Sequence, residues 1–256
     1  MLSMLRSNLY RLVKTRLTWA YALVCVLLIC MEPLVWFFTA SSSASYGDPL
    51  NPTMTAVQMY GGALGSGVLF LASVYCAVFF AADFKTRSIK NVLQARGGRV
   101  SYALAAAATV LILHVGAIVA GSVVAGAAYQ ALGFAIAESS AIDVALLFCQ
   151  FLLVSAAYSL IAVLLVFATG NETLATVATL VVSSGLFESF LRVGLANAFA
   201  DFPPLRDCLD GYLAVQMNLL DAGTVSDAGG FAAAAATCAA ALCLCVLVMK
   251  KRELAK

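Results

Sequence analysis

Six long apolar runs constrain this chain more than any other feature of its sequence. Each run approaches or exceeds the roughly 20 residues that an α-helix needs to cross a bilayer core of about 30 Å. The sequence therefore predicts an all-α, polytopic membrane protein whose six transmembrane helices occupy residues 17–38, 57–82, 102–128, 142–168, 173–193 and 231–249. The whole chain, 1–256, is expected to form a single transmembrane domain.

The composition supports this class. The chain is 63% hydrophobic and 11% charged, whereas soluble domains are about 45–50% apolar and about 25% charged. The apolar runs are too long and too numerous for a secretory signal peptide. All of the eight cysteines except Cys208 fall inside these runs, where cysteine acts as a small hydrophobic residue. Their spacing predicts no metal site.

Lysine and arginine are confined to alternate loops. On this topology one side of the membrane carries Arg6, Arg11, Lys14, Arg16, Lys85, Arg87, Lys90, Arg96, Arg99, Lys250, Lys251, Arg252 and Lys256. The other side keeps only Arg192 and Arg206. Excess cationic residues in short loops mark the cytoplasmic side, so both termini and the tail 250–256 are expected in the cytoplasm. The turn at 169–172 has no cation, so the fourth and fifth helices are placed by parity.

Residues 83–99 form the one interior segment that concentrates charge, with five basic residues and one acid. Ile89, Val92 and Leu93 follow an i, i+3, i+4 pattern, which predicts a helix with one apolar stripe on a basic body. Gly97 and Gly98 are placed to end that helix. Such a helix can lie on anionic lipid or fit a partner protein. A solvated loop that only obeys the orientation rule is the alternative.

Residues 1–16 are predicted to form a second amphipathic helix, with leucines on one side. Its cationic residues expected at the membrane interface are Arg6, Arg11, Lys14 and Arg16. On the opposite side of the membrane, the loop 194–230 is expected to hold a short helix opening at Pro203–Pro204. Ser140 and Asn171 are expected to cap the fourth and fifth transmembrane helices.

Motifs for bond chemistry are weak or missing. The chain has no G-x-x-x-x-G-K-[ST] motif, and its only histidine, His114, excludes H-E-x-x-H and a haem held by two histidines. Ser66 and His114 could form an intramembrane Ser–His dyad. Small residues in spanning helices usually serve packing, so His114 is expected to be a packed or water-facing polar side chain. Glu32 is expected to be solvated near the outer interface, and Glu188 to pair with Arg192.

The sequence pattern resembles the permease subunits of ABC-2 type ATP-driven transporters over essentially the whole chain. At residue level the likeness lies in AADFKTRSIKNVLQARGGRVSYALA, with Asp83 leaving the second span, a short helix, the Gly97–Gly98 turn and Arg99 before the third. The acid is aspartate where glutamate is commoner in the family. The lysine often found just inside the third span is replaced in the alanine run 105–108. The size and short loops are most similar to bacterial permeases of lantibiotic/bacitracin-type peptide export and self-immunity.

The resemblance implies a non-enzymatic subunit of the bacterial plasma membrane that exports a peptide antibiotic, drug or lipid-like substrate. It would pair with a second permease, identical or not, and dock on a separate ATPase that binds ATP and magnesium, so this chain itself would bind no cofactor. Membrane lipid is an expected partner and nucleic acid is not. The ATPase-docking residues implied are Asp83, Phe84, Lys85, Arg87, Ile89, Lys90, Val92 and Leu93. The alternatives are an ion-coupled secondary transporter, which would need buried charges near the bilayer midplane, and a non-transporting scaffold or sensor subunit.

Overall fold

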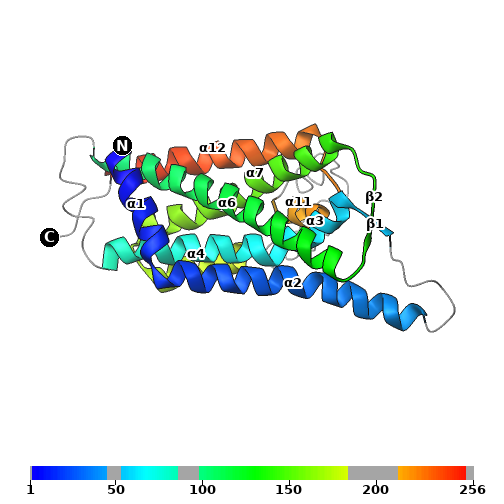
Figure 1. Cartoon of the computed structure of the whole chain (residues 1–256). Coiled ribbons are helices and arrows are strands. Elements are labelled where there is room, and N and C mark those ends of the chain that lie inside the picture. The colour runs from blue at the N-terminus through cyan, green and yellow to red at the C-terminus, as the bar shows by residue number, and fades with distance from the viewer. Residues whose placement is uncertain (1, 45–52, 86–97, 184–212, 252–256) are drawn as a thin grey trace.

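The computed structural model describes residues 2–44, 53–85, 98–183 and 213–251, and these form an elongated bundle of helices (Figure 1). The long helices that run beside one another are α2 (Arg16–Ala44), α4 (Ser66–Lys85), α6 (Gly98–Ala131), α7 (Ala141–Thr169) and α12 (Ala228–Lys251). In the described part of the chain, α2, α6, α7 and α12 are long and apolar enough to cross a membrane. The prediction of a mostly helical chain is therefore confirmed, and several of its helices have the length and composition to span a membrane.

The shorter helices occupy the ends of the bundle (Figure 1). At one end α1 (Leu2–Lys14) lies across the start of α6. At the other end α3 (Ala56–Leu64) and α11 (Leu213–Asp221) pack together. Helix α8 (Glu172–Ser183) covers the first part of the predicted fifth span. The rest of that span, the Glu188–Arg192 pair, Pro203–Pro204 and Cys208 lie outside the described residues, so the count of six spans stays a prediction.

The predicted second span, 57–82, is wrong as a single helix. It is divided at Gly65 into α3 and α4, and a capping box between Thr55 and Gln58 starts α3. A glycine at position 61 permits this arrangement, because a Cβ there would lie 2.5 Å from the backbone oxygen of Leu220. The close approach of α11 to α3 therefore depends on the absence of a side chain at position 61.

Two short strands correct the all-α prediction. β1 (Thr53–Thr55) pairs in parallel with β2 (Ala135–Ala137), and Thr53 faces Ala135. The backbone N–H of Ala56 continues the contact by donating to Ser139 Oγ at 2.9 Å. Such short strands show too little alternation for a sequence pattern to predict them. Their pairing joins the segment before α3 to the segment between α6 and α7.

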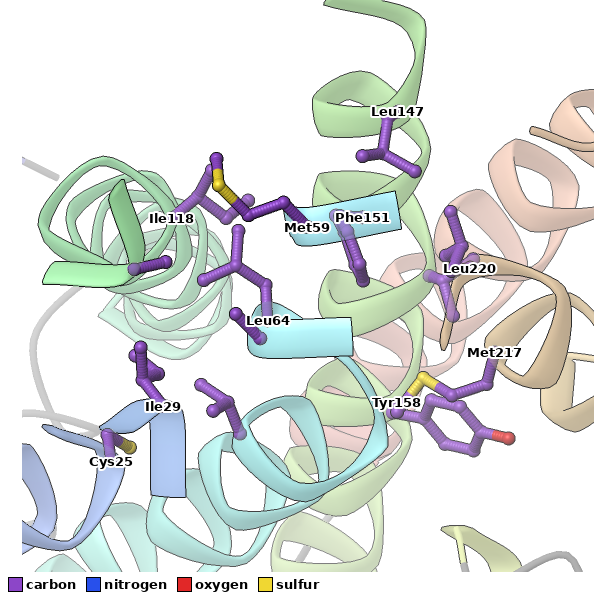
Figure 2. Packing of buried hydrophobic residues seen from close by; sticks show 14 of the residues in the cluster. Cys25, Ile29, Met59, Leu64, Ile118, Leu147, Phe151, Tyr158, Met217 and Leu220 are labelled. Atoms are coloured by element: carbon purple, nitrogen blue, oxygen red, sulfur yellow. The ribbon is translucent and has the colours of Figure 1, made fainter. Parts of the chain in front are cut away.

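Helix α7 is the centre of the packing, since it contacts α4, α6, α8 and α12. In Figure 2, side chains of α3 such as Met59 and Leu64 lie between Ile118 of α6 and Phe151 of α7. Leu220 of α11 packs on the same cluster (Figure 2). Contacts with α6, α7 and α11 thus bury α3 on three sides.

Both predicted helix caps are confirmed. The Ser140 hydroxyl accepts from the backbone N–H of Ile142 at 3.3 Å at the start of α7. Asn171 Oδ1 accepts from the N–H groups of Thr173 and Leu174 at 3.0 and 3.4 Å. Gly170, with φ +67°, ends α7 in the left-handed conformation, so the turn between α7 and α8 is set by local chemistry.

Candidate functional site

The charged side chains divide between the two ends of the bundle. Every described lysine and arginine lies at the end where α1 crosses the bundle (Figure 1), which we call the basic end: Arg6, Arg11, Lys14, Arg16, Lys85, Arg99, Lys250 and Lys251. The opposite end carries the acids Glu138, Asp143, Asp221 and Asp227. The described cations therefore gather on one side, as the loop pattern predicted. The end of α4 at Lys85 and the start of α6 at Gly98 both lie at this basic end.

The basic end is organised around a buried carboxylate. Asp83, near the end of α4, is only 5% exposed. Its Oδ1 accepts from Arg11 of α1, and its Oδ2 accepts from the Tyr102 hydroxyl of α6 at 2.6 Å. The Arg11 guanidinium also lies 4.9 Å from the centroid of the Phe79 ring, at a cation–π distance. Three helices thus meet at one ionic cluster of Arg11, Asp83 and Tyr102, which we call the latch.

A second polar contact fixes α1 to α6 on its buried side. Asn8 is 4% exposed, and its Nδ2 donates to Thr109 Oγ1 at 3.4 Å. Because a buried amide is costly without a partner, Asn8 adds specificity to the orientation of α1. Helix α1 is therefore bound to the bundle through polar side chains as well as through its leucines.

Two exposed contacts surround the latch. Lys85 Nζ lies 3.7 Å from Glu172 Oε2, which relates the end of α4 to the start of α8. Arg99 Nη1 donates to the backbone oxygen of Lys250 at 3.1 Å, which relates the start of α6 to the end of α12. Exposed pairs of this kind contribute little stability. They do show that both ends of segment 86–97 adjoin the other helices of the basic end.

The predicted interface residues of α1 divide into two groups. Arg6, Lys14 and Arg16 are exposed, as a membrane-surface role requires. Arg11 is only partly exposed, because its guanidinium forms an ion pair with Asp83. The amphipathic pattern could not separate Arg11 from the others, since its partner is far away in the sequence.

The predicted docking residues are also placed differently from one another. Asp83 is buried, so it holds α1 and α6 rather than presenting a surface. Phe84 is partly buried against Phe167, with ring centroids 6.0 Å apart, and Lys85 is exposed. The remaining docking residues, Arg87, Ile89, Lys90, Val92 and Leu93, lie outside the described residues.

A second polar cluster lies deeper in the bundle, between α4, α6 and α7. His114 is 1% exposed; its Nδ1 lies 2.7 Å from the Val110 oxygen and its Nε2 lies 3.1 Å from Ser159 Oγ. Ser159 Oγ is in turn 3.3 Å from Ser73 Oγ. His114 is thus a packed polar residue, as expected. The Ser–His contact in this cluster is made by Ser159 of α7.

Sequence reasoning missed the latch, the Asn8–Thr109 contact and the His114–Ser159 contact. The only available signals were polar residues on otherwise apolar helix faces, which indicate burial with a partner but do not name the partner. Within the described ranges, no group of three His, Cys, Asp or Glu side chains could hold a metal ion.

Comparison with known proteins adds no assignment. No protein-family model matches the chain, and no curated protein is similar enough to count as a relative. The basic end and the membrane character of the helices are therefore the features that bear on function.

Proposed function

We propose that this protein is the transmembrane permease subunit of an ABC-2 type transporter, driven by a separate ATPase that docks on residues 85–93, next to the buried Asp83. In this proposal the chain crosses the plasma membrane six times and the basic end faces the cytoplasm. The transported substrate is a peptide antibiotic, a drug or a lipid-like molecule that leaves the cell. Two permease subunits pair to form the pathway, and this chain performs no bond chemistry.

The observation that carries the proposal is the latch, whose Asp83 and Tyr102 lie close to segment 86–97 in the sequence. The segment joins the end of α4 to the start of α6. Asp83 and Tyr102, which lie on either side of it, are bonded to each other, and Asp83 is also bonded to α1. A force on the segment would therefore move α1, α4 and α6 together. This is the rigid connection that a docking helix needs if it is to transmit the closure of an ATPase to the membrane helices.

The charge distribution supports the orientation. Described cations gather at the basic end and described acids dominate the other, which matches the positive-inside rule if the basic end is cytoplasmic. The α3–α11 end, with its paired strands, then faces outward. A partner approaching the basic end would meet exposed cations from α1, α4 and α12 around the segment.

Site-directed photocrosslinking in native membranes tests the docking role. A benzophenone amino acid replaces Ile89 or Leu93, on the predicted apolar stripe. The same probe at Val119, on the exposed face of α6, serves as a matched control. Crosslinked partners are digested and sequenced. We expect adducts from positions 89 and 93, but not from 119, with a polypeptide that contains G-x-x-x-x-G-K-[ST], and we expect ATP with vanadate to change their yield.

Charge reversal supplies an independent check on the same surface. The triple variant Lys85→Glu, Arg87→Glu and Lys90→Glu should reduce recovery of the ATPase with the tagged protein. The double variant Lys250→Glu and Lys251→Glu, at the same end of the bundle, should reduce it less. Recovery of no ATPase under any mild-detergent condition, together with adducts that lack a nucleotide-binding motif, would exclude the proposal.

The buried polar cluster of α4, α6 and α7 favours one second candidate, an ion-coupled secondary transporter. His114 is a titratable side chain deep among spanning helices, where such residues often belong to ion pathways. If protons drive transport through it, uptake or export in vesicles should follow an imposed pH gradient without ATP, and His114→Asn should abolish it. Transport that needs ATP and survives His114→Asn would reject this candidate.

A further inference from the structure

An apolar groove lies between α1, α2 and α6. Its volume is about 300 Å³, near the lower bound for small-ligand pockets. The lining includes Leu9 and Leu12 from α1, Cys25 and Ile29 from α2, and Gly116 from α6. No charged side chain lines it. Because α2 and α6 are membrane-spanning helices, hydrocarbon rather than water is the natural content of this groove.

Gly116 borders the open part of this groove. A Cβ built there meets no atom within 4 Å, so the groove remains open beside the backbone of α6. By contrast, a Cβ at Gly121, which also lines the groove, would meet Leu64 Cδ2 at 2.5 Å. The groove is therefore unfilled at 116 and closed by the core at 121.

One end of the groove adjoins the α1–α2 junction. Leu12 and Thr18 line the groove, and Lys14 and Arg16 lie between them in the chain, both exposed. The junction has a fixed geometry, since the Trp19 indole donates to the Val13 oxygen at 3.0 Å. No acidic side chain among the described residues forms an ion pair with Lys14 or Arg16. An apolar channel thus ends beside two cations that are available to an anion.

We propose that this groove binds one anionic phospholipid, with an acyl chain along α2 and α6 and the phosphate between Lys14 and Arg16. The charge pattern selects this occupant over a second copy of the chain. A twofold partner seated on the same face would bring its own α1 cations against these, and like charges at close range are destabilising. The inference needs only that the chain spans a bilayer, so it is independent of the ATP-driven mechanism proposed above.

Native mass spectrometry of the full-length protein in detergent tests the site. The protein is titrated with phosphatidylglycerol or with phosphatidylcholine of identical acyl chains, and lipid adducts and oligomeric state are read from the same spectra. We expect one phosphatidylglycerol per chain to be retained in preference to phosphatidylcholine. Gly116→Leu should fill the groove and weaken retention by about tenfold or more. Val123→Leu, on the exposed face of α6 and outside the groove, should leave retention unchanged.

Neutralisation separates the phosphate contact from the acyl contact. Lys14→Gln with Arg16→Gln should lower the phosphatidylglycerol affinity by about fivefold per charge removed and leave the phosphatidylcholine affinity unaltered. Lys250→Gln with Lys251→Gln removes equal charge from the basic end away from the groove, and should have little effect. Equal retention of both lipids, equal effects of the two charge pairs, or loss of a dimer rather than of lipid in Gly116→Leu would overturn the assignment.

Discussion

The latch makes an asymmetric prediction about stability. Replacing Arg11 by methionine removes the cation that bonds to the Asp83 carboxylate, which is 5% exposed. Removing one partner from a buried ion pair costs about 3 kcal/mol or more. Replacing Asp83 by asparagine instead leaves Arg11, whose side chain is 35% exposed and can turn toward water or lipid phosphate. That change should cost only about 1–2 kcal/mol.

The double variant decides whether the two groups act as a pair. Once Asp83 is asparagine, the loss of Arg11 no longer leaves a buried carboxylate without its cation. The double variant should therefore be about as stable as Asp83→Asn alone. The coupling energy should then equal in size the cost of Arg11→Met alone, about 3 kcal/mol or more, as expected for directly bonded residues. Titration with SDS in mixed micelles, followed by circular dichroism, measures the free energies of unfolding. Lys85→Gln, which removes the exposed partner of Glu172, should change stability by less than about 1 kcal/mol.

One result would refute this reasoning. If Arg11→Met and Asp83→Asn destabilise the protein equally, and their effects add in the double variant, the carboxylate is not held by Arg11. The latch would then not connect α1 to α4, and the mechanical argument for force transfer through segment 86–97 would lose its basis.

Three further predictions concern the packing at two glycines, the contact of Gln150 with Ser226, and the cap of α8. Gly61→Ala should destabilise the protein by about 1–3 kcal/mol, because the added Cβ would overlap a backbone oxygen of α11. Gly116→Ala should be neutral or stabilise the protein by up to about 1 kcal/mol, because the added Cβ meets no other atom. Thermal unfolding in detergent compares the two variants. Gln150→Leu removes an amide that contacts both the N–H, at 2.9 Å, and the hydroxyl of Ser226, so the Ser226 amide should exchange hydrogen faster, and unchanged exchange would deny the contact. Asn171→Ala should cost about 1 kcal/mol through the lost cap of α8, measured by SDS titration.

The sequence was sufficient for features that depend on neighbours along the chain. Long apolar runs predicted the spanning helices, and the residue types of Ser140 and Asn171 predicted their caps correctly. These features follow from local hydrogen bonding and from the length of a helix that crosses a bilayer, so a single segment contains the information.

The tertiary structure decided what depends on distant parts of the chain. Whether the run 57–82 continues as one helix or breaks at Gly65 is set by the approach of α11, and β1 exists only because β2 lies beside it. The sequence pattern predicts Arg11 and Asp83 as surface charges of their own amphipathic segments, yet the two form an ion pair at the basic end. A local pattern indicates that a buried polar side chain needs a partner. Which residue is that partner is determined by the packing of α1, α4 and α6.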